Sequence, residues 1–387
     1  MSDVLLVDAG FSARPLKRAL EGGGYRVHTV GARPTDALAT ENPHHHLIDY
    51  SNVDALASLI DDLNPVNVIP GCTDLSYEVC SQLVDKGLIQ GLESSAALRQ
   101  LHNKAEFRDL CVAQNIPVPT RFNSEQEALS AACPLAVKPA DAFSGKGITI
   151  LPAPNPASLT SAVADARAFS RTQSVVIEQF VSGQLFSYSA FLWQGKVEQA
   201  FSVVEYGFVN PLVVDTSYVV SRASVEERLR GYTERLCSAL GLTSGLFHIQ
   251  YIDAESGPSL IEVTRRCPGD LYSELIQRAT GFDYSARYVS SFLAEPLGMT
   301  GSMGTPAPFT VRHTLTGRVT GYLSHAEFLK PQQIRAWYPL ASSGVAMSPS
   351  PGGRVGVAFL ESKSVKERDQ LVADISSGRF ATIHYSS

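Results

Sequence analysis

The chain has 387 residues and a formal net charge of −6, with 18% charged and 44% hydrophobic residues. This length exceeds what one hydrophobic core usually holds, so two or three globular domains are expected. The sequence lacks the basic stripe of a nucleic-acid-binding protein, an apolar run of about 18–20 residues that would span a membrane, and the basic start of a signal peptide.

The N-terminal hundred residues alternate between strand and helix patterns. Strands are predicted at 4–10, 26–31 and 65–71, and helices at 14–25 and 52–64. This alternation predicts a Rossmann-like α/β domain with a parallel sheet. The first turn, DAGFSA, lacks the full G-x-G-x-x-G pattern, so dinucleotide binding is not expected there. The three histidines His44–His46 could bind a metal, but their polar setting after Pro43 favours a solvated turn.

The central part of the chain changes to longer helices and antiparallel hairpins. The predicted elements are a helix at 101–120 that ends before NIPVPT, a strand, loop and strand at 134–151, a helix at 155–170, a strand at 174–183, a helix at 224–240, and hairpins at 186–208 and 245–264. The hairpin turns are placed at Gln194–Gly195 and at 255–257, where glycine allows a tight turn. A Gly- and Pro-rich linker at 296–308 precedes a small C-terminal α+β unit.

Two lysines and a glycine-bearing loop form the first candidate site. Lys104 lies on a predicted helix, and Lys138 ends an apolar strand that runs into the loop 141–147. Gly145 and Gly147 allow a turn that directs backbone N–H groups toward phosphate oxygens, while lysines supply the compensating charge. Taken alone, the GKG sequence is more typical of a plain hairpin turn.

Two further segments carry polar groups on strands. The strand end at 178–181 offers alternating backbone donors and acceptors to an adenine edge, although a plain edge strand has the same pattern. The hairpin at 245–264 is expected to place Gln250 opposite Glu262, with Thr264 close by. Oxygen ligands on neighbouring strands suit a hard divalent cation that also holds phosphate. By themselves these residues also fit an open polar sheet face.

The order and spacing of these features resemble the ATP-grasp superfamily, in particular its carboxylate–amine ligases and its biotin carboxylase-like branch. KPADAFSGKG resembles the family's phosphate-binding loop, HNKAEFRDLCVAQNIPVPT its K…L…GIP.P segment, and FHIQYIDAESGPSLIEVTRRCPG its metal-binding strand pair. The resemblance implies mixed α/β and α+β architecture: a pre-ATP-grasp domain at 1–100, an ATP-grasp domain at 101–300 with a mobile lid at 138–180, and a C-terminal α+β domain at 305–387.

The resemblance also implies a role for each candidate residue. ATP phosphates would meet Lys104, Lys138, Ser144, Gly145, Lys146 and Gly147; adenine would meet Glu178, Gln179, Phe180 and Val181, mostly through the backbone; and Mg²⁺ would meet Gln250, Glu262 and Thr264. Lys138 and Arg266 would be catalytic, with Arg266 contacting the substrate carboxylate or its acyl phosphate, because a guanidinium can grip two oxygens.

The sequence departs from the family pattern at three places. Gln250 stands where the family usually has Glu, Thr264 where it has Asn, and Leu185 where a ribose-binding Glu is common. Neutral oxygen ligands weaken the attraction for Mg²⁺ but keep the geometry. We therefore expect a working enzyme, with a non-catalytic ATP-binding or scaffold protein as the alternative.

The implied reaction activates a small-molecule carboxylate with ATP and couples the acyl phosphate to an amine, with an amino acid as one candidate substrate. Candidate substrate contacts, besides Arg266, are Glu205, Tyr206, Asp215, Arg222 and Asp270. A bicarbonate-activating carboxylase is a further alternative, although CPGDLYSE replaces the QVEH run of that branch. Nucleic-acid and membrane partners are not expected, and a homodimer is left open.

The six cysteines are scattered without a CxxC pair. This spacing is typical of reduced thiols rather than structural disulfides or a zinc cage, so a cytoplasmic location is expected. Cys267 follows the two arginines of IEVTRRCPG, and a packing role is favoured over a catalytic thiol because no activating partner is visible.

Overall fold

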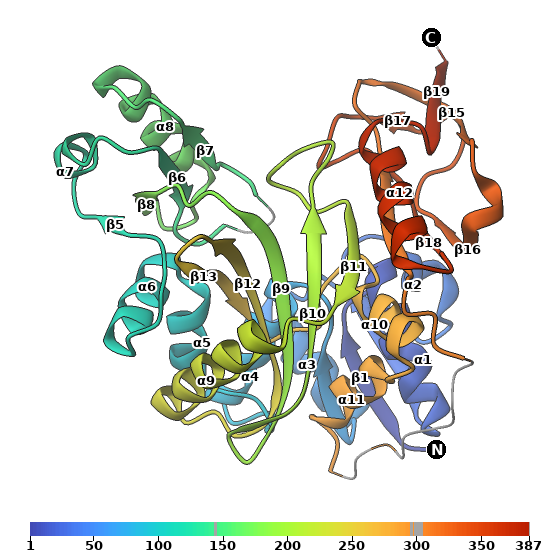
Figure 1. The fold of residues 1–387 in the computed structure, drawn as a ribbon. Helices are drawn as coiled ribbons and strands as arrows, with labels where there is room; N and C mark the ends of the chain where they lie inside the picture. The colour runs from blue at the N-terminus through green and yellow to red at the C-terminus, as the bar shows by residue number, and fades with distance from the viewer. Residues whose placement is uncertain (143–144, 295–296, 298–304, 387) are drawn as a thin grey trace.

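The computed structural model describes residues 1–142, 145–294, 297 and 305–386. Two lobes rise from a common base (Figure 1). One lobe contains α7 (Glu125–Ser130) and α8 (Pro156–Phe169), the other contains α12 (Val365–Ser376), and strands of a large sheet lie between them. Within the described ranges, no helix is long and apolar enough to cross a membrane.

The N-terminal part forms the predicted parallel sheet, with strand order β3-β2-β1-β4. Its elements are β1 (Asp3–Val7), η1 (Phe11–Ala13), α1 (Arg14–Gly22), β2 (Arg26–Gly31), α2 (Ala37–Glu41), β3 (His45–Leu47), α3 (Val53–Leu63), β4 (Asn67–Pro70) and α4 (Asp74–Asp85). Asn52 and Thr73 cap α3 and α4 with side-chain oxygens that accept backbone N–H groups. Leu5 and Leu6 are both fully buried, in separate apolar clusters, because both faces of this sheet are covered.

The histidine run at 44–46 is not the solvated turn that the sequence favoured. His45–Leu47 forms the edge strand β3, which pairs in parallel with β2. His46 Nε2 lies 2.9 Å from His28 Nδ1 on β2. The edge of β2 offers backbone hydrogen-bond partners to residues 45–47, and the polarity of the segment alone does not indicate this pairing. In the described part of the chain, no group of three or more His, Cys, Asp or Glu side chains is arranged to hold a metal ion.

The helix predicted from residue 101 to just before Asn115 begins later, as α6 (Lys104–Ala113), because residues 101 and 102 end a separate helix, α5 (Ser95–His102). Asn103 separates them with an extended backbone, and its side-chain oxygen accepts the N–H groups of Ala105 and Glu106 at 3.0 and 3.2 Å. Asparagine favours this capping position over a helix interior, because its side chain competes for backbone hydrogen bonds. The break places Lys104 in the first turn of α6.

The lid segment is a small antiparallel sheet with strand order β5-β8-β6-β7, covered by α7 and α8. Its strands are β5 (Arg121–Phe122), β6 (Leu135–Pro139), β7 (Thr149–Leu151) and β8 (Val175–Gln179). Leu135 and Val137 of β6 pack with Leu159 and Val163 of α8 in a core of their own. Lys138 therefore stands at the end of a strand that this small core fixes, while the mobility of 138–180 stays a prediction.

Gly147→Ala should destabilise the lid sheet by about 1–3 kcal/mol. Gly147 has a φ of +68°, and an added Cβ would lie 2.8 Å from Phe169 Cβ and 2.9 Å from Pro139 Cγ. Limited proteolysis of the lid and thermal unfolding would measure the loss. Gly231→Ala in α9 (Ala223–Leu240) is the matched control, because its Cβ meets nothing within 4 Å and alanine favours a helix. Equal stability of the two variants would contradict the assignment.

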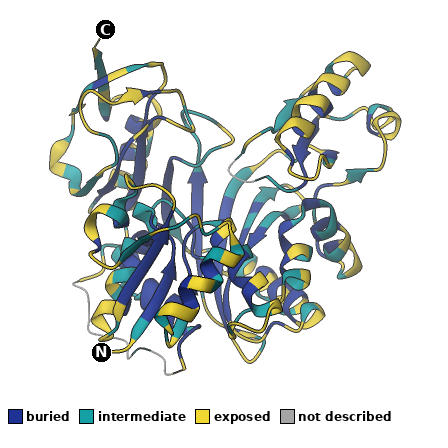
Figure 2. Ribbon diagram, turned by 180° about the vertical axis from the view of Figure 1, so that it is seen from behind, coloured by how far each residue is buried: buried dark blue, intermediate teal, exposed yellow. Residues whose placement is uncertain are grey.

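The large sheet has eight strands in the order β13-β12-β9-β10-β11-β14-β18-β16. They are β9 (Gln184–Trp193), β10 (Lys196–Tyr206), β11 (Thr216–Val220), β12 (Gly245–Ala254), β13 (Gly257–Thr264), β14 (Val311–Thr316), β16 (Ile334–Pro339) and β18 (Arg354–Leu360). Both predicted hairpins are present, with Gln194 and Gly195 at φ values of 51° and 75° in the first turn. Much of this sheet is buried (Figure 2).

The two faces of the large sheet have different neighbours. On one face, Tyr188 and Leu192 of β9 share an apolar cluster with residues of α9. On the other face, Phe191 of β9 shares a cluster with the N-terminal sheet, α10 (Tyr272–Thr280) and α11 (Tyr284–Ser290). Ser187 and Ser189 of β9 alternate onto this second face, where both lie within hydrogen-bonding distance of the Tyr272 hydroxyl. The second face is therefore the one that carries polar groups toward the N-terminal part.

The C-terminal segment is only partly a unit of its own. Three of its strands, β14, β16 and β18, extend the large sheet by pairing next to β11. The others are β15 (Gly321–Phe328), β17 (Ala346–Met347) and β19 (Ala381–Ser386), which form a three-stranded sheet; η2 (Pro331–Gln333) lies between β15 and β16. The exposed edge of β11 explains the extension, since an unpaired edge accepts a further strand. Most of the predicted linker, at 298–304, lies outside the described residues.

Acidification from pH 6.5 to about 4 should destabilise the fold through two buried histidines. Burial lowers the pKa of His313 to about 4 and that of His248 to about 3. Because both values lie below the unfolded value, the unfolded chain binds more protons in this window and stability falls as the pH falls. Each histidine contributes a slope of about 1.4 kcal/mol per pH unit.

Urea unfolding of the wild type and of His313→Gln at several pH values would test this pH dependence. In the variant, the free energy of unfolding should fall less steeply as the pH falls. The difference should equal the slope contributed by one titrating histidine. His384→Gln is the control, because the side chain of His384 is 40% exposed beside Glu327. An unchanged slope in His313→Gln would refute the assignment.

Candidate active site

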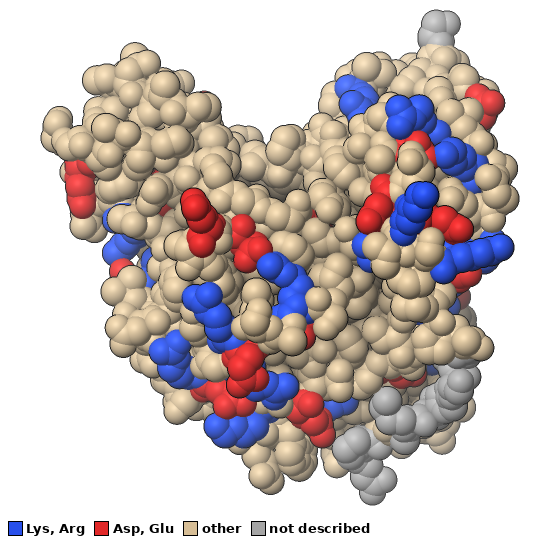
Figure 3. Space-filling view, in the orientation of Figure 1, with Lys and Arg blue, Asp and Glu red and all other residues tan. Residues whose placement is uncertain are grey.

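A hollow lies between the two lobes in the space-filling view (Figure 3). The hairpin of β12 and β13 borders the N-terminal part there, and its register brings Gln250 directly opposite Glu262, as the sequence predicted. His248 is opposite Thr264 two residues away. Glu262 and Gln250 are partly exposed, whereas His248 and Thr264 are buried. The hairpin therefore presents a carboxylate and an amide side by side on one face.

Arg266 is held by Asp74, which the sequence analysis did not identify. Arg266 Nε and Nη2 donate to Asp74 Oδ1 and Oδ2, both at 2.9 Å, and Thr264 Oγ1 donates to Oδ1 at 3.2 Å. Burial lowers the pKa of Arg266, but the Asp74 carboxylate outweighs it and raises that pKa above its ordinary value. Asp74 begins α4 just after the cap Thr73, so this acid links the N-terminal part to the strand end. Thr264 and Arg266, two of the predicted site residues, therefore both contact the Asp74 carboxylate.

The neighbours of Arg266 point elsewhere. Arg265 Nε donates to Glu93 Oε1 at 2.8 Å. Cys267 is fully buried in the core next to the N-terminal part, consistent with the packing role. The two adjacent arginines thus have different acidic partners, as alternation along a strand end requires.

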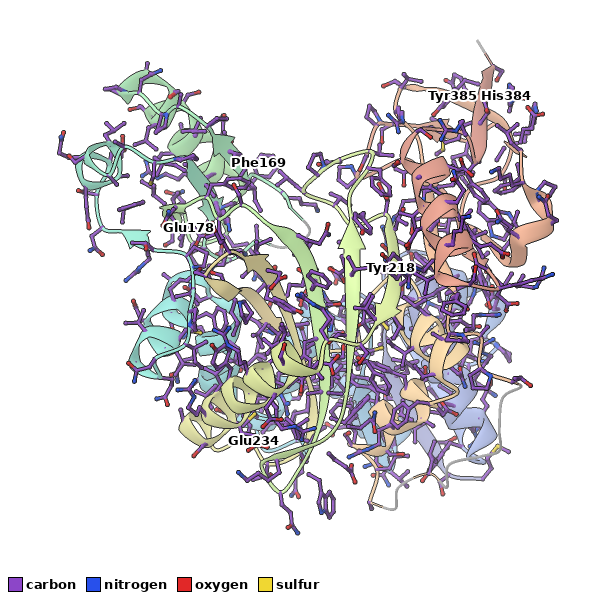
Figure 4. All side chains as sticks on the ribbon, in the orientation of Figure 1. Phe169, Glu178, Tyr218, Glu234, His384 and Tyr385 are labelled. Atoms are coloured by element: carbon purple, nitrogen blue, oxygen red, sulfur yellow. The ribbon has the colours of Figure 1, made fainter. Side chains whose placement is uncertain are left out.

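Lys138 belongs to a buried charge cluster in the lid. Lys138 Nζ donates to Glu178, and Arg108 Nε of α6 donates to Glu178 Oε2 at 3.0 Å. Glu178 is 1% exposed; burial alone would raise its pKa, but the two cations lower it below the ordinary value. Glu178 is labelled in the lid lobe in Figure 4. The predicted adenine contact therefore uses its side chain to hold Lys138.

Lys104 lies next to the start of the loop that follows β6. Its Nζ donates to the Ala142 carbonyl at 2.6 Å, and its backbone N–H donates to the Ala140 carbonyl at 3.0 Å. Gly145 is partly exposed with φ +72°, and Lys146 is exposed. Ser144, the remaining loop residue predicted to contact phosphate, lies outside the described residues. Lys104 is thus held against the described start of the loop, at Ala140 and Ala142, and its phosphate contact stays a prediction.

The strand end at 178–181 differs from the predicted adenine edge in its backbone donors. The N–H of Gln179 donates to the Thr120 carbonyl at 2.9 Å, and the N–H of Phe180 donates to the Pro134 carbonyl at 2.8 Å. These two donors are already used within the protein, because β8 continues its pairing beyond the strand. An adenine contact at Gln179 and Phe180 would therefore rest on their carbonyl groups.

The predicted substrate residues Glu205, Asp270 and Asp215 have different hydrogen-bond partners in the structure. Glu205 accepts a hydrogen bond from Gln250 Nε2 at 2.7 Å, and burial raises the pKa of its carboxyl. Asp270 follows the strand end and accepts from Arg354. Asp215 instead accepts from the Val209 N–H at 2.9 Å and shapes its own loop.

Arg222 and Tyr206 lie away from the Gln250–Glu262 pair. Arg222 Nη2 donates to Asp253 Oδ2 at 2.6 Å and lies over the Phe186 ring, at 4.4 Å from its centroid. Phe186 belongs to the apolar cluster on the α9 side of the large sheet. Tyr206 stacks on Phe208, at 5.0 Å between ring centroids. The structure brings Glu205, but not Arg222, to the face of the Gln250–Glu262 pair.

Sequence reasoning missed three residues of this region: Asp74, Arg108 and Arg312. Asp74 follows a helix-capping threonine, a signal that indicates a helix start but not a partner. Arg108 is one turn after Lys104, and Arg312 stands in FTVRHTL, a stretch rich in residues that favour strands. Arginine is rarely buried, and Arg312 is 3% exposed.

Known proteins share the sequence and the fold at low identity. No family model matches the chain. The formate-dependent phosphoribosylglycinamide formyltransferase of Burkholderia mallei is 27% identical over 331 residues, covering 80% of this chain and 78% of that protein. The phosphoribosylglycinamide synthetase of Anaerococcus prevotii has a TM-score of 0.74 at 17% identity, with 100% of each chain covered.

The L-amino acid ligase of Bacillus licheniformis has a TM-score of 0.78 at 16% identity, covering 100% of this chain and 99% of that chain. At these identities the structural likeness shows the fold. It agrees with the parallel N-terminal sheet, the lid and the large antiparallel sheet described above. The fold that the sequence motifs indicated is confirmed: the chain has the ATP-grasp fold of these proteins.

Proposed function

We propose that the protein is an ATP-dependent ligase that activates a small-molecule carboxylate as an acyl phosphate and couples it to an amine. The observation that carries the proposal is the in-register pair Gln250 and Glu262 near Arg266, together with Lys138 near the end of β6. Two of the proteins with this fold are a synthetase and an amino acid ligase by name, which supports the same class of reaction.

The donor set of the hairpin fits Mg²⁺. Glu262 has no ion-pair partner within 4.0 Å among the described residues, so its carboxylate is available to a cation. Gln250 donates its Nε2 to Glu205, which leaves the carbonyl oxygen Oε1 as a ligand. Glu262 and Gln250 would hold the ion together with ATP phosphate oxygens. Bound Mg²⁺ would neutralise charge that develops on the transferred phosphoryl group.

The remaining residues have roles in binding and charge compensation. Lys104 and Lys138 would bind ATP phosphates beside the loop 141–147. The substrate carboxylate attacks the γ-phosphoryl group to form an acyl phosphate and ADP. The amine then attacks the acyl carbon, and inorganic phosphate leaves with the electron pair of the broken C–O bond. Arg266 would stabilise the acyl phosphate, which requires it to share its guanidinium with Asp74 or exchange partners.

ADP formation is the direct test of this proposal. The protein would be incubated with Mg·ATP and pairs of acids and amines, beginning with formate and phosphoribosylglycinamide, the pair suggested by the name of the Burkholderia relative. ADP release that requires both an acid and an amine supports a ligase. ATP binding without turnover for any pair favours the alternative of a non-catalytic nucleotide binder, which the neutral residues Gln250 and Thr264 suggest.

We also propose a cytoplasmic location and a homodimeric state. All six cysteines are free thiols in the structure, and five of them are buried. Free thiols support a reducing compartment. Sedimentation analysis of the purified protein would determine whether it is a monomer or a dimer.

A further inference from the structure

A line of polar side chains crosses the large sheet beside the Gln250–Glu262 pair. Glu205 on β10 is directly opposite Ser217 on β11, and Ser217 is directly opposite Arg312 on β14. Directly opposite residues of antiparallel strands point to the same face. That face is the one of Gln250, because Gln250 hydrogen-bonds to Glu205. A carboxylate and a guanidinium thus share this face two strand spacings apart, about 9–10 Å between backbones.

Arg312 is a buried cation without a carboxylate partner among the described residues. Two other buried arginines, Arg108 and Arg265, have carboxylate oxygens at 3.0 and 2.8 Å. None of the carboxylates that the structure describes lies within 4.0 Å of Arg312, which is 3% exposed. Its Nη1 donates to the Asp270 carbonyl at 3.0 Å, and its Nε has no hydrogen-bond partner. Because a buried charge is costly without a counter-ion, an anion bound here would stabilise the site.

Glu205 is a buried carboxylate without a cationic partner among the described residues. It is 4% exposed, and its carboxylate accepts hydrogen bonds from two neutral groups, Gln250 Nε2 at 2.7 Å and the Ser187 hydroxyl. Among the residues with described placement, no lysine, arginine or histidine nitrogen lies within 4.0 Å of its carboxylate. Ser217, between Glu205 and Arg312, is fully buried, and its Oγ has no hydrogen-bond partner in the described part of the chain. Along this line, the described part of the chain thus places a carboxylate without a cation (Glu205), a hydroxyl without a hydrogen-bond partner (Ser217) and a guanidinium without a carboxylate (Arg312).

We propose that Glu205 and Arg312 bind the two charges of an amino acid, with the ammonium at Glu205 and the carboxylate at Arg312. The proposal rests on the ligase function proposed above and names the class of its amine substrate. The strand order supports this orientation, because Glu205 on β10 contacts Gln250 at the metal pair, whereas Arg312 on β14 is two strands further away. The amine of the amino acid is thereby placed toward the end of the site where the acyl phosphate forms.

Ligand-observed NMR with the twenty standard L-amino acids and the protein bound to Mg·AMP-PNP is the first step of the test. The best-binding amino acid is then compared with its carboxamide, which lacks the negative charge, and with its α-hydroxy acid, which lacks the positive charge. Each analogue should bind the wild type about 10- to 100-fold more weakly, as expected for hydrogen bonds to charged groups. Arg312→Met should remove the preference for the acid over its carboxamide, and Glu205→Gln should remove the preference for the amine over the hydroxyl.

The control separates a substrate contact from a structural one. Arg287→Met removes another arginine, one paired with Glu198 and packed on Phe191, and should keep both preferences. If Arg312 only supports the Asp270 carbonyl, Arg312→Met will weaken all ligands equally and leave both preferences intact, which overturns the proposal. The comparison of analogues in the wild type needs no variant, so a carboxamide that binds as well as its amino acid also overturns it.

The outcomes also distinguish this inference from the ligase function. ADP formation with amines that carry no carboxylate, together with no amino acid binding, overturns the zwitterion site and leaves the ligase in place. Charge-selective amino acid binding without ADP formation for any acid supports the zwitterion site and contradicts the ligase.

Discussion

Glu262→Gln should reduce ATP-dependent ligation by more than about 100-fold, because residues that only support metal ligands already cost about 10- to 100-fold when changed. Glu262 is the partly exposed carboxylate of the in-register pair, and the variant keeps its size while removing its charge. ATP turnover as a function of Mg²⁺ concentration, measured with the acid–amine pair that gives ADP, would report the change. Wild-type turnover and Mg²⁺ dependence in the variant would rule out the metal assignment.

Gln250→Glu is the informative counterpart of that variant. It restores the family's usual carboxylate, so the apparent affinity for Mg²⁺ should rise, although turnover need not, because tighter ground-state binding does not lower the barrier. The structure adds Glu205 as a second carboxylate near the pair, which sequence reasoning had not placed at the metal site. Without Mg²⁺ the new carboxylate would face Glu205 and be repelled. The variant should therefore melt at a lower temperature than wild type without Mg²⁺ and regain stability when Mg²⁺ is added.

Glu178→Gln should destabilise the protein by about 3–5 kcal/mol, the usual cost of removing one partner from a buried ion pair. The change leaves the charges of Arg108 and Lys138 buried beside a neutral amide, in a place where Glu178 is 1% exposed. Chemical denaturation would measure the loss, and limited proteolysis would locate it in the lid. A loss below about 1 kcal/mol would mean that water or movement compensates the two cations.

Lys138→Met is the matched comparison for the charge cluster. Glu178 keeps its hydrogen bond from Arg108 at 3.0 Å, so the fold should tolerate this change better than the loss of Glu178. ATP affinity should instead fall by about 1.5–3 kcal/mol, the range for hydrogen bonds to charged groups. Titration calorimetry with Mg·AMP-PNP would measure it, and an unchanged affinity would contradict the phosphate role of Lys138.

The sequence by itself determined those features that depend on local pattern. Alternation of strands and helices predicted the parallel N-terminal sheet, and the turn at 255–257 predicted that Gln250 and Glu262 face each other. Antiparallel hairpins are predictable in this way because the turn sets the register and the register sets the neighbours. The same reasoning failed at Asn103, where a side chain that caps a helix interrupts a continuous apolar pattern.

Tertiary structure alone decided which distant charges meet. Arg266 binds Asp74 across 192 positions of the chain, and Arg108 binds Glu178 across 70. Arg312 reaches the line of Glu205 only because β14 pairs beside β11, although the sequence suggested a separate C-terminal unit. Polarity and periodicity report that a side chain needs a partner, but the partner is set by the packing of whole elements, which burial of apolar area drives without regard to individual charges.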